Sequence, residues 1–210
     1  MPPRSIIEVA AEDDAEIREF LSTHFFNYDE FINPPSDFDY KIRFDTIAGD
    51  NSQKTPIMFS DTISGANFEF GMETITVESS SFGVTDEEVS DHTLYYLVVR
   101  QGGAEEMPTI GDNVVLRYEG TLLDGTLFDA SSNQPVTFNL SGVVRGFGNG
   151  MEYLKTGTNL IVNDDGTVTY SDYGIGAIFI PSGLAYFNRG SRFYNRSVYS
   201  INFQGRLIYI

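Results

Sequence analysis

The segment 114–147 constrains the fold of this chain more than any other part of its sequence. Residues 114–118 read Val-Val-Leu-Arg-Tyr, a run rich in residues that favour β-strands. The pair Asp124-Gly125 follows, and this pair is typical of tight turns between antiparallel strands. A strand, a turn and a second strand-like run in this order predict an antiparallel hairpin.

The length and composition set broad limits. The 210 residues allow one large domain or two small ones. No apolar run approaches the ~20 residues of a membrane helix, and no apolar leader follows Met1. The sequence contains no cysteine, which excludes disulfides, cysteine–zinc sites and thiol catalysis. Because cytosolic proteins usually keep a few thiols, this absence favours the cell envelope, with an exported leader already removed, over the cytoplasm.

The charge distribution predicts two parts. The net charge is −17, and such an acidic chain repels nucleic-acid backbones, so we expect no nucleic-acid partner. Residues 1–91 carry 20 Asp and Glu against 5 Lys and Arg, whereas residues 92–210 carry 10 against 8. We therefore expect an acidic N-terminal extension over 1–91 and a second domain over 92–210.

Secondary structure in the extension follows from apolar periodicity. Residues 1–10 are expected to be a tether, and the acidic residues 12–14 suit the positive end of a helix predicted over 13–25. On that helix His24 lies on the apolar face, which predicts a packed histidine. Strands are expected at 38–44, where apolar and charged residues alternate, and at 68–77. The sequence leaves open whether this part forms its own module or extends the sheet of the second domain.

The second domain is dominated by β-structure. A short helix is expected at 151–156, and Asp164-Asp165-Gly166 reads as the turn of a hairpin inserted over 158–176, because the spacing of a calcium loop is missing. The fold class is therefore α+β. The remaining strands are expected at 94–99, 114–118, 177–181 and 198–210.

No constellation for nucleophilic or metal catalysis stands out. The sequence has two histidines far apart and no G-x-S-x-G nucleophile elbow. The glycine-rich segment 146–150 lacks the Lys-Ser/Thr of a phosphate-binding loop. We therefore expect neither a cofactor nor a metal.

Several motifs together resemble the FKBP-type peptidyl-prolyl cis-trans isomerases. Residues 118–131 (YEGTLLDGTLFDAS) are similar to the family's aromatic-ended strand, Asp-Gly turn and Phe-Asp pair. Residues 135–138 (PVTF), 143–147 (VVRGF) and 180–186 (IPSGLAY) follow in the family's order. The resemblance covers about 92–210 and implies an FKBP-like antiparallel sheet curled around a short helix.

The resemblance also implies a site. Phe147 would form the pocket floor, Tyr186 and the backbone N–H of Val144 would donate hydrogen bonds to peptide carbonyls, and Asp129 would accept hydrogen bonds from pocket groups. The implied catalytic residues are Tyr118, Phe128, Asp129 and Tyr186. The implied substrate-binding residues are Val136, Val143, Val144, Phe147, Phe193 and Ile201.

Some positions depart from the family pattern. Phe147 stands where the family usually has Trp, Val136 and Ile201 stand where Phe is common, and Phe187 replaces a Gly. These changes are expected either to tune substrate choice or to leave a pocket that binds with little turnover. The alternative to an isomerase is therefore a non-catalytic chaperone or protein-binding module on the same fold.

The whole chain is similar to FKBP-type lipoproteins of Bacteroidetes-like bacteria. This resemblance implies proline-containing polypeptide substrates among folding envelope or secreted proteins. It also implies a periplasmic or outer-membrane-attached location, with membrane attachment only through a lipid anchor that is absent from this chain. A cytoplasmic location is the alternative.

Overall fold

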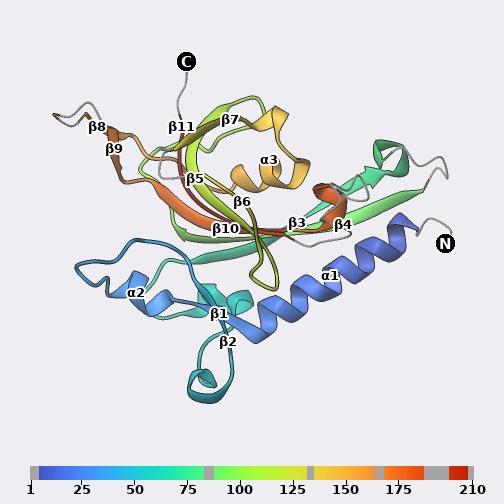
Figure 1. Ribbon diagram of the computed structural model, residues 1–210, viewed down its shortest axis with the longest axis horizontal. Coiled ribbons are helices and arrows are strands. Elements are labelled where there is room, and N and C mark those ends of the chain that lie inside the picture. Colours follow the sequence, from blue (N-terminus) through green and yellow to red (C-terminus); the bar gives the residue numbers. More distant parts are fainter. Residues whose placement is uncertain are drawn as a thin grey trace.

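A single antiparallel sheet organises the fold. The computed structural model describes residues 5–82, 88–131, 135–162, 164, 168–186 and 199–207. Within these residues seven strands form one sheet in the order β3-β4-β10-β11-β5-β6, and β7 shares the outer edge of β5 with β6 (Figure 1). The strands are β3 (Glu69–Glu78), β4 (Val89–Arg100), β5 (Asn113–Leu122), β6 (Leu127–Ala130), β7 (Val136–Asn139), β10 (Gly174–Ile180) and β11 (Tyr199–Leu207).

The short helix α3 (Arg145–Met151) covers one face of this sheet (Figure 1). Phe147 and Met151 of the helix are buried against the strands. Gly146 and Gly150 lie one turn apart, and a Cβ atom on them would come within 2.4 Å of Ile180 Cγ2 and 2.5 Å of Ile178 Cδ1 respectively. Glycine at these two positions allows the helix to approach β10 this closely. The expected α+β fold, a sheet around a short helix, is confirmed.

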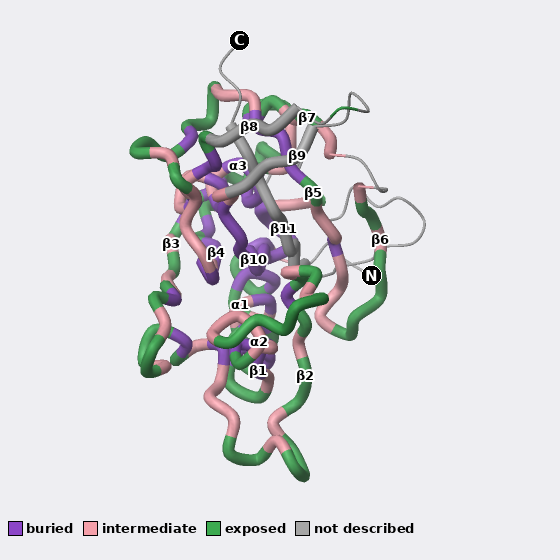
Figure 2. Tube along the Cα trace, turned by 90° about the vertical axis from the view of Figure 1, so that its left-hand side faces the viewer, coloured by how far each residue is buried: buried purple, intermediate pink, exposed green. Residues whose placement is uncertain are grey.

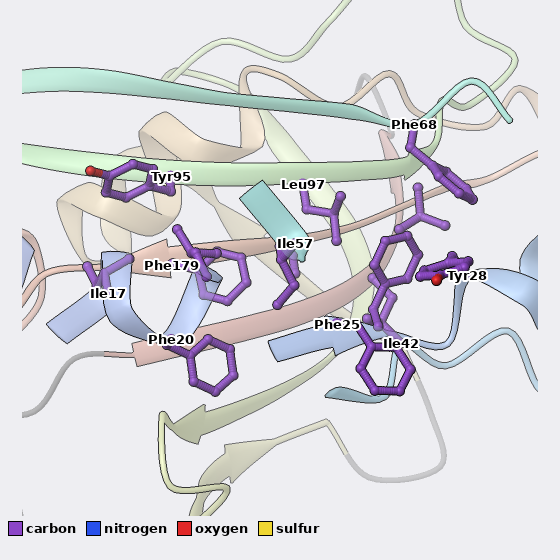
Figure 3. Packing of buried hydrophobic residues seen from close by; sticks show 14 of the residues in the cluster. Ile17, Phe20, Phe25, Tyr28, Ile42, Ile57, Phe68, Tyr95, Leu97 and Phe179 are labelled. Carbon is purple, nitrogen blue, oxygen red and sulfur yellow. The ribbon is translucent and has the colours of Figure 1, made fainter. Parts of the chain in front are cut away.

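The N-terminal part of the chain covers the opposite face (Figure 1). It contributes a second core in which aromatic side chains pack on the sheet, as Phe20 does on Phe179 of β10 (Figure 3). The elements of this layer are α1 (Ile6–Thr23), β1 (His24–Phe26), α2 (Tyr28–Ile32), β2 (Phe44–Thr46) and the 3-10 helix η2 (Ile57–Thr62).

Because both faces are covered, the central strand β10 is buried at every position and runs through the middle of the buried region (Figure 2). Ile178 and Ile180 belong to the core around α3, whereas Ala177 and Phe179 belong to the core under α1. The two-residue period of the strand therefore joins both cores. It also explains why the sequence of β10 shows an apolar run and no alternation.

Helix α1 begins earlier than predicted. It starts at Ile6, and Ser5 caps it by accepting a hydrogen bond from the backbone N–H of Ile7 at 3.2 Å. Glu88 reaches back to this end and accepts hydrogen bonds from the Ser5 hydroxyl and the Ile6 N–H. The prediction of a tether over 1–10 is therefore wrong for the described residues, because Ile6 and Val9 are buried. His24 packs as expected, stacked on Phe20 at 4.0 Å between ring centroids.

The strand predicted at 38–44 is also wrong. Only Phe44 belongs to a strand, β2, which pairs with β1. Tyr40 has a φ of 57°, a conformation that a strand cannot contain. The alternation in the sequence reflects a loop whose rings pack on one another, since the centroids of Phe38 and Tyr40 lie 4.9 Å apart and those of Phe31 and Phe38 also lie 4.9 Å apart.

The short helix of the second domain lies six residues before its predicted place. It covers Arg145–Met151, whereas a helix was expected at 151–156. Glycine disfavours helices, and for that reason the glycine-rich segment 146–150 does not look helical in sequence. Close packing on β10 overrides that preference.

The other predicted strands are confirmed within one to five residues. The inserted hairpin is present as β8 (Asn159–Val162) paired with β9 (Val168–Ser171). The expected division at 91/92 falls inside β4, and β3 from the acidic part pairs along the length of β4. The acidic extension therefore extends the sheet, and the division into two domains stays a prediction.

Four further 3-10 turns complete the described structure. They are η1 (Gly49–Asn51), η3 (Ser79–Phe82), η4 (Leu140–Gly142) and η5 (Ser182–Leu184). Among the helices that the structure describes, none combines the length and apolar character needed to cross a bilayer.

A buried histidine gives the fold a pH dependence. His92 of β4 is 1% exposed and packs closely against Gly183. Burial lowers the pKa of His92 to about 4; the positive charge of Arg145 adds to this effect and Asp91 opposes it. In the unfolded chain the pKa returns to about 6.5, so between pH 6.5 and 4 protons bind the unfolded state and not the folded one.

We therefore expect the free energy of unfolding to fall as pH drops from 6.5 towards 4. Urea titrations at several pH values, followed by circular dichroism, measure this slope. His92→Leu should flatten the slope over this window. An unchanged slope in His92→Leu would contradict the assignment.

Candidate active site

A cavity of about 310 Å³ opens between the sheet and the start of α3. The strands β5, β6, β7 and β10, the helix α3 with the turn before it, and the segment after η5 all contribute to its lining. The lining residues are Tyr118, Phe128, Asp129, Phe138, Gly142, Val143, Val144, Phe147, Ile180, Ala185 and Tyr186.

Three aromatic rings form the apolar depth of this cavity. Phe147 of α3 is 4% exposed. Its ring centroid lies 6.0 Å from that of Phe138 in an edge-to-face arrangement and 6.5 Å from that of Tyr118. Tyr118 and Phe138 are 5.5 Å apart, also edge to face. These spacings are those of favourable aromatic pairs, so the rings hold each other in place.

An irregularity in β6 brings Phe128 and Asp129 to the same cavity. Neighbouring residues of a regular strand point to opposite faces. Here the pairing of β5 with β6 shifts between Gly120 and Thr121, which are opposite Asp129 and Leu127, so Phe128 is the extra residue of a bulge. Bulges re-aim side chains in this way, and both residues line the cavity.

The hairpin turn before β6 sets this arrangement. Gly125 has a φ of 85°, which favours glycine, and the Asp124 side chain accepts a hydrogen bond from the Thr126 N–H at 2.9 Å. The Asp124-Gly125 pair thus closes the turn that the sequence predicted.

The polar pair of the cavity is Tyr118 with Asp129. The Tyr118 hydroxyl donates a hydrogen bond to Asp129 Oδ2 at 2.7 Å. Burial, this hydrogen bond and the negative charge of Asp129 all raise the pKa of Tyr118 well above its usual value. Tyr118 therefore keeps its proton at any physiological pH and fixes the orientation of the carboxylate.

The start of α3 adds backbone donors. Val144 is the N-cap residue of α3, and the N–H groups at the beginning of a helix have no partner within the helix. Val143 and Val144, at the start of the helix, both line the cavity. Tyr186, which also lines the cavity, is 47% exposed.

The comparisons with known proteins match the part of the chain that contains this cavity. Residues 104–189 match the family model of the FKBP-type peptidyl-prolyl cis-trans isomerases. The chain carries an FKBP-type domain. The described residues of this domain include every cavity-lining residue named above.

Curated relatives match the same half of the chain. The chain is 38% identical over 100 residues to the probable FKBP-type peptidyl-prolyl cis-trans isomerase FkpA of Neisseria meningitidis, which covers 47% of this chain and 30% of that protein. It is 34% identical over 95 residues to the peptidyl-prolyl cis-trans isomerase Mip of Coxiella burnetii, covering 44% and 34%. The chain thus spans about a third of the length of these relatives. The crystal structure of FkpA from Escherichia coli has a TM-score of 0.44 at 31% identity and covers 54% of this chain and 46% of that one.

The FKBP-type domain places most of the predicted residues around one cavity. All four residues predicted as catalytic line it, and so do Val143, Val144 and Phe147. Val136 lies on β7 but outside the lining. Ile201 lies on β11 opposite Gly120, and Phe193 falls outside the described residues.

Four lining residues were missed: Phe138, Gly142, Ile180 and Ala185. Signals for three of them were present, because Phe138 ends the PVTF motif and Ile180 and Ala185 belong to IPSGLAY. Phe138 lies two residues after Val136 on the same strand and therefore shares its face. Gly142 had no signal in the sequence. Among the described residues, no three His, Asp or Glu side chains gather as metal ligands do.

Gly120 allows the Phe128 ring to lie against the backbone of β5. A Cβ atom at Gly120 would come within 2.6 Å of Phe128 Cζ. We expect Gly120→Ala to displace the ring and weaken the affinity for a proline-containing peptide a few-fold. The fold should be retained because the ring turns towards the open cavity. Peptide titrations with NMR detection measure this change.

Gly111→Ala is the matched control, because a Cβ atom at Gly111 meets nothing within 4 Å. The same peptide affinity in the Gly120 and Gly111 variants would show that the Phe128 ring takes no part in binding.

Proposed function

We propose that this chain catalyses the cis-trans isomerisation of Xaa-Pro bonds in polypeptides, with the proline ring bound in the cavity over Phe147. The observation that carries the proposal is the combination of an aromatic-floored cavity with the Tyr118–Asp129 pair at its side. The FKBP-type family match over the same residues supports it.

The chemistry suits such a cavity. Rotation about a peptide bond faces a barrier of ~18–20 kcal/mol because resonance stiffens the C–N bond. The cis and trans forms of an Xaa-Pro bond differ by only about 0.5–1 kcal/mol. An apolar cavity disfavours the charge-separated resonance form and can bind the twisted amide better than either planar isomer. Neither effect requires a proton-transfer residue.

We assign roles to individual groups on this basis. The Tyr186 hydroxyl and the Val144 N–H donate hydrogen bonds to carbonyls of the bound peptide. Asp129, held by Tyr118, presents a carboxylate to the twisting amide and its neighbours. Phe128 closes the side wall over the proline ring.

The substrates that we propose are folding proteins of the cell envelope. The absence of cysteine from the chain favours an envelope location, and the resemblance of the whole chain to FKBP-type lipoproteins of Bacteroidetes-like bacteria implies one. We further propose that the protein works in the periplasm or at the outer membrane, tethered through a lipid anchor outside this chain. Fractionation of cells that express the tagged full-length protein tests the location.

A non-catalytic binding module is the second candidate. It is favoured by Phe147, where the family usually has Trp, because the smaller ring offers a bound proline a smaller aromatic floor. A module of this kind would bind proline-containing segments or suppress aggregation without accelerating the exchange.

NMR exchange spectroscopy on short Xaa-Pro peptides with varied Xaa separates the two. Accelerated exchange that is lost in Phe128→Ala supports the isomerase. Peptide binding without acceleration in the folded protein would replace it with the binding module.

A further inference from the structure

Helix α1 carries a carboxylate side chain that is fully buried. Asp13 of α1 is 0% exposed. Its Oδ2 atom accepts hydrogen bonds from the Ser182 N–H at 2.8 Å and from the Ser182 hydroxyl at 2.5 Å. Ser182 is itself only 1% exposed. A buried carboxylate is costly unless it is well hydrogen-bonded. The two hydrogen bonds from Ser182 therefore stabilise Asp13 in its buried position.

The contact is made next to the cavity wall. Ser182 opens η5, the single turn between Ile180 and Ala185, which both line the cavity. The Ala185 N–H donates a hydrogen bond to the Ser182 carbonyl at 3.0 Å. One chain of hydrogen bonds therefore runs from Asp13 through Ser182 to Ala185, and Tyr186 follows directly.

The other side of η5 is packed without room for adjustment. A Cβ atom on Gly183 would lie 2.1 Å from His92 Cε1, and one on Gly146 would lie 3.1 Å from Leu184 Cβ. The turn is thus held between α1, β4 and α3. Packing fixes two sides of the turn, and the two hydrogen bonds that Ser182 donates to Asp13 hold its third side.

We propose that Asp13 is a positioning residue of the cavity, so that the N-terminal helix controls substrate binding without touching substrate. The inference rests on the proposed function and deepens it. Helix α1 lies outside residues 104–189, the segment that matches the FKBP-type family. The acidic extension thereby supplies a part of the site that the family segment does not contain.

A second link joins the extension to the cavity. Arg145, the first residue of α3, donates a hydrogen bond from Nη1 to the backbone carbonyl of Thr76 in β3 at 3.1 Å. Arg145 follows Val143 and Val144, which line the cavity. Both turns that form the cavity mouth are therefore tied to residues that precede the family segment.

The neighbouring residue Asp14 offers a matched control. It lies on the same helix and accepts a hydrogen bond from the Tyr95 hydroxyl at 2.7 Å, so it ties α1 to β4 without contacting η5. Asp13→Asn, Asp13→Ala, Ser182→Ala and Asp14→Asn are compared in the full chain, at a temperature where thermal scans show each of them folded.

Catalysed exchange of an Ala-Pro peptide and the backbone amide signals of residues 183–186 are measured together. We expect Asp13→Ala to lower kcat/KM about tenfold, because small displacements at a site cost much activity. Asp13→Asn should lose less of its kcat/KM, since the amide oxygen of asparagine can still accept the hydrogen bonds from Ser182. Asp14→Asn should stay within about twofold of the wild type while losing stability.

The outcomes separate the two proposals. Equal kcat/KM values in the Asp13 and Asp14 variants, with unmoved signals at 183–186, would overturn the positioning role while the isomerase stands. If the wild type accelerates no exchange, the proposed function fails, and the amide signals alone decide whether Asp13 sets the turn. Signals that move in Asp13→Asn and not in Asp14→Asn support the positioning role.

Discussion

Gly150→Ala is expected to lower the free energy of unfolding by about 2 kcal/mol, although alanine is the better helix former. In an exposed helix this change stabilises by roughly 1 kcal/mol. Here the added methyl group would lie 2.5–2.8 Å from three atoms of Ile178. Ile178 is 0% exposed on the central strand and has no space to retreat. Overpacking of a close-packed core costs ~1–3 kcal/mol or more and outweighs the helical gain.

Chemical denaturation at neutral pH measures this effect. Asn149→Ala, one residue earlier on α3, is the control for helix propensity and should be neutral or slightly stabilising. Ile178→Ala removes the three clashing atoms and costs ~2–5 kcal/mol by itself. In that background the Gly150→Ala change should be neutral or stabilising, because the new methyl fills part of the void. A cost that persists there would mean that another contact of α3 is responsible.

Asp129→Ala is expected to lower kcat/KM for Xaa-Pro exchange by about tenfold or more. Its carboxylate is the acceptor for the Tyr118 hydroxyl at 2.7 Å. Without it the Tyr118 hydroxyl loses its hydrogen-bond partner beside an apolar cavity. Asp129 is exposed at the cavity rim, so the loss should appear in activity and not in stability.

Two further variants locate this effect. Tyr186→Phe removes the hydroxyl proposed as a donor to the peptide and should also lower activity without unfolding the domain. Asp124→Asn, in the exposed turn of the same hairpin, is the control for loss of negative charge and should leave kcat/KM within about twofold. NMR exchange rates at saturating and limiting peptide give kcat and KM separately. Unchanged turnover in both Asp129→Ala and Tyr186→Phe would exclude this cavity as the site.

The sequence predicted those parts of the fold where local pattern and packing agree. The β-rich runs of β4 and β5 became strands because their side chains also find a core. The sequence misled where long-range packing overrides local preference. The glycines of α3 disfavour a helix locally, and only their close approach to β10 makes them the residues that fit. The true start of α1 did have a signal, because Ser5 followed by Glu8 three residues later is a capping-box pattern.

The site was predicted through motifs and not through periodicity. Strand alternation would place Phe128 and Asp129 on opposite faces, and only the bulge between β5 and β6 brings both to the cavity. The role of Asp13 was beyond sequence reasoning for a different reason. An acid in the first half of a helix looks like an ordinary solvated or dipole-compensating residue, and nothing local indicates that Ser182 will cover it.

The hydrogen bonds between Asp13 and Ser182 span 169 positions of the chain. At a synthesis rate of ~5–20 residues per second, α1 therefore waits roughly 10–30 s on the ribosome before its partner exists. The pairing of β4 with β10 joins residues that are 75 to 84 positions apart, from Ile175 with Arg100 to Phe179 with Tyr95. Contact order this high slows folding, and the contacts of α1 with β10 and η5 form only after the last third of the chain has begun to be made. A protein proposed to accelerate the folding of other proteins is therefore itself expected to fold slowly and to complete its core late in synthesis.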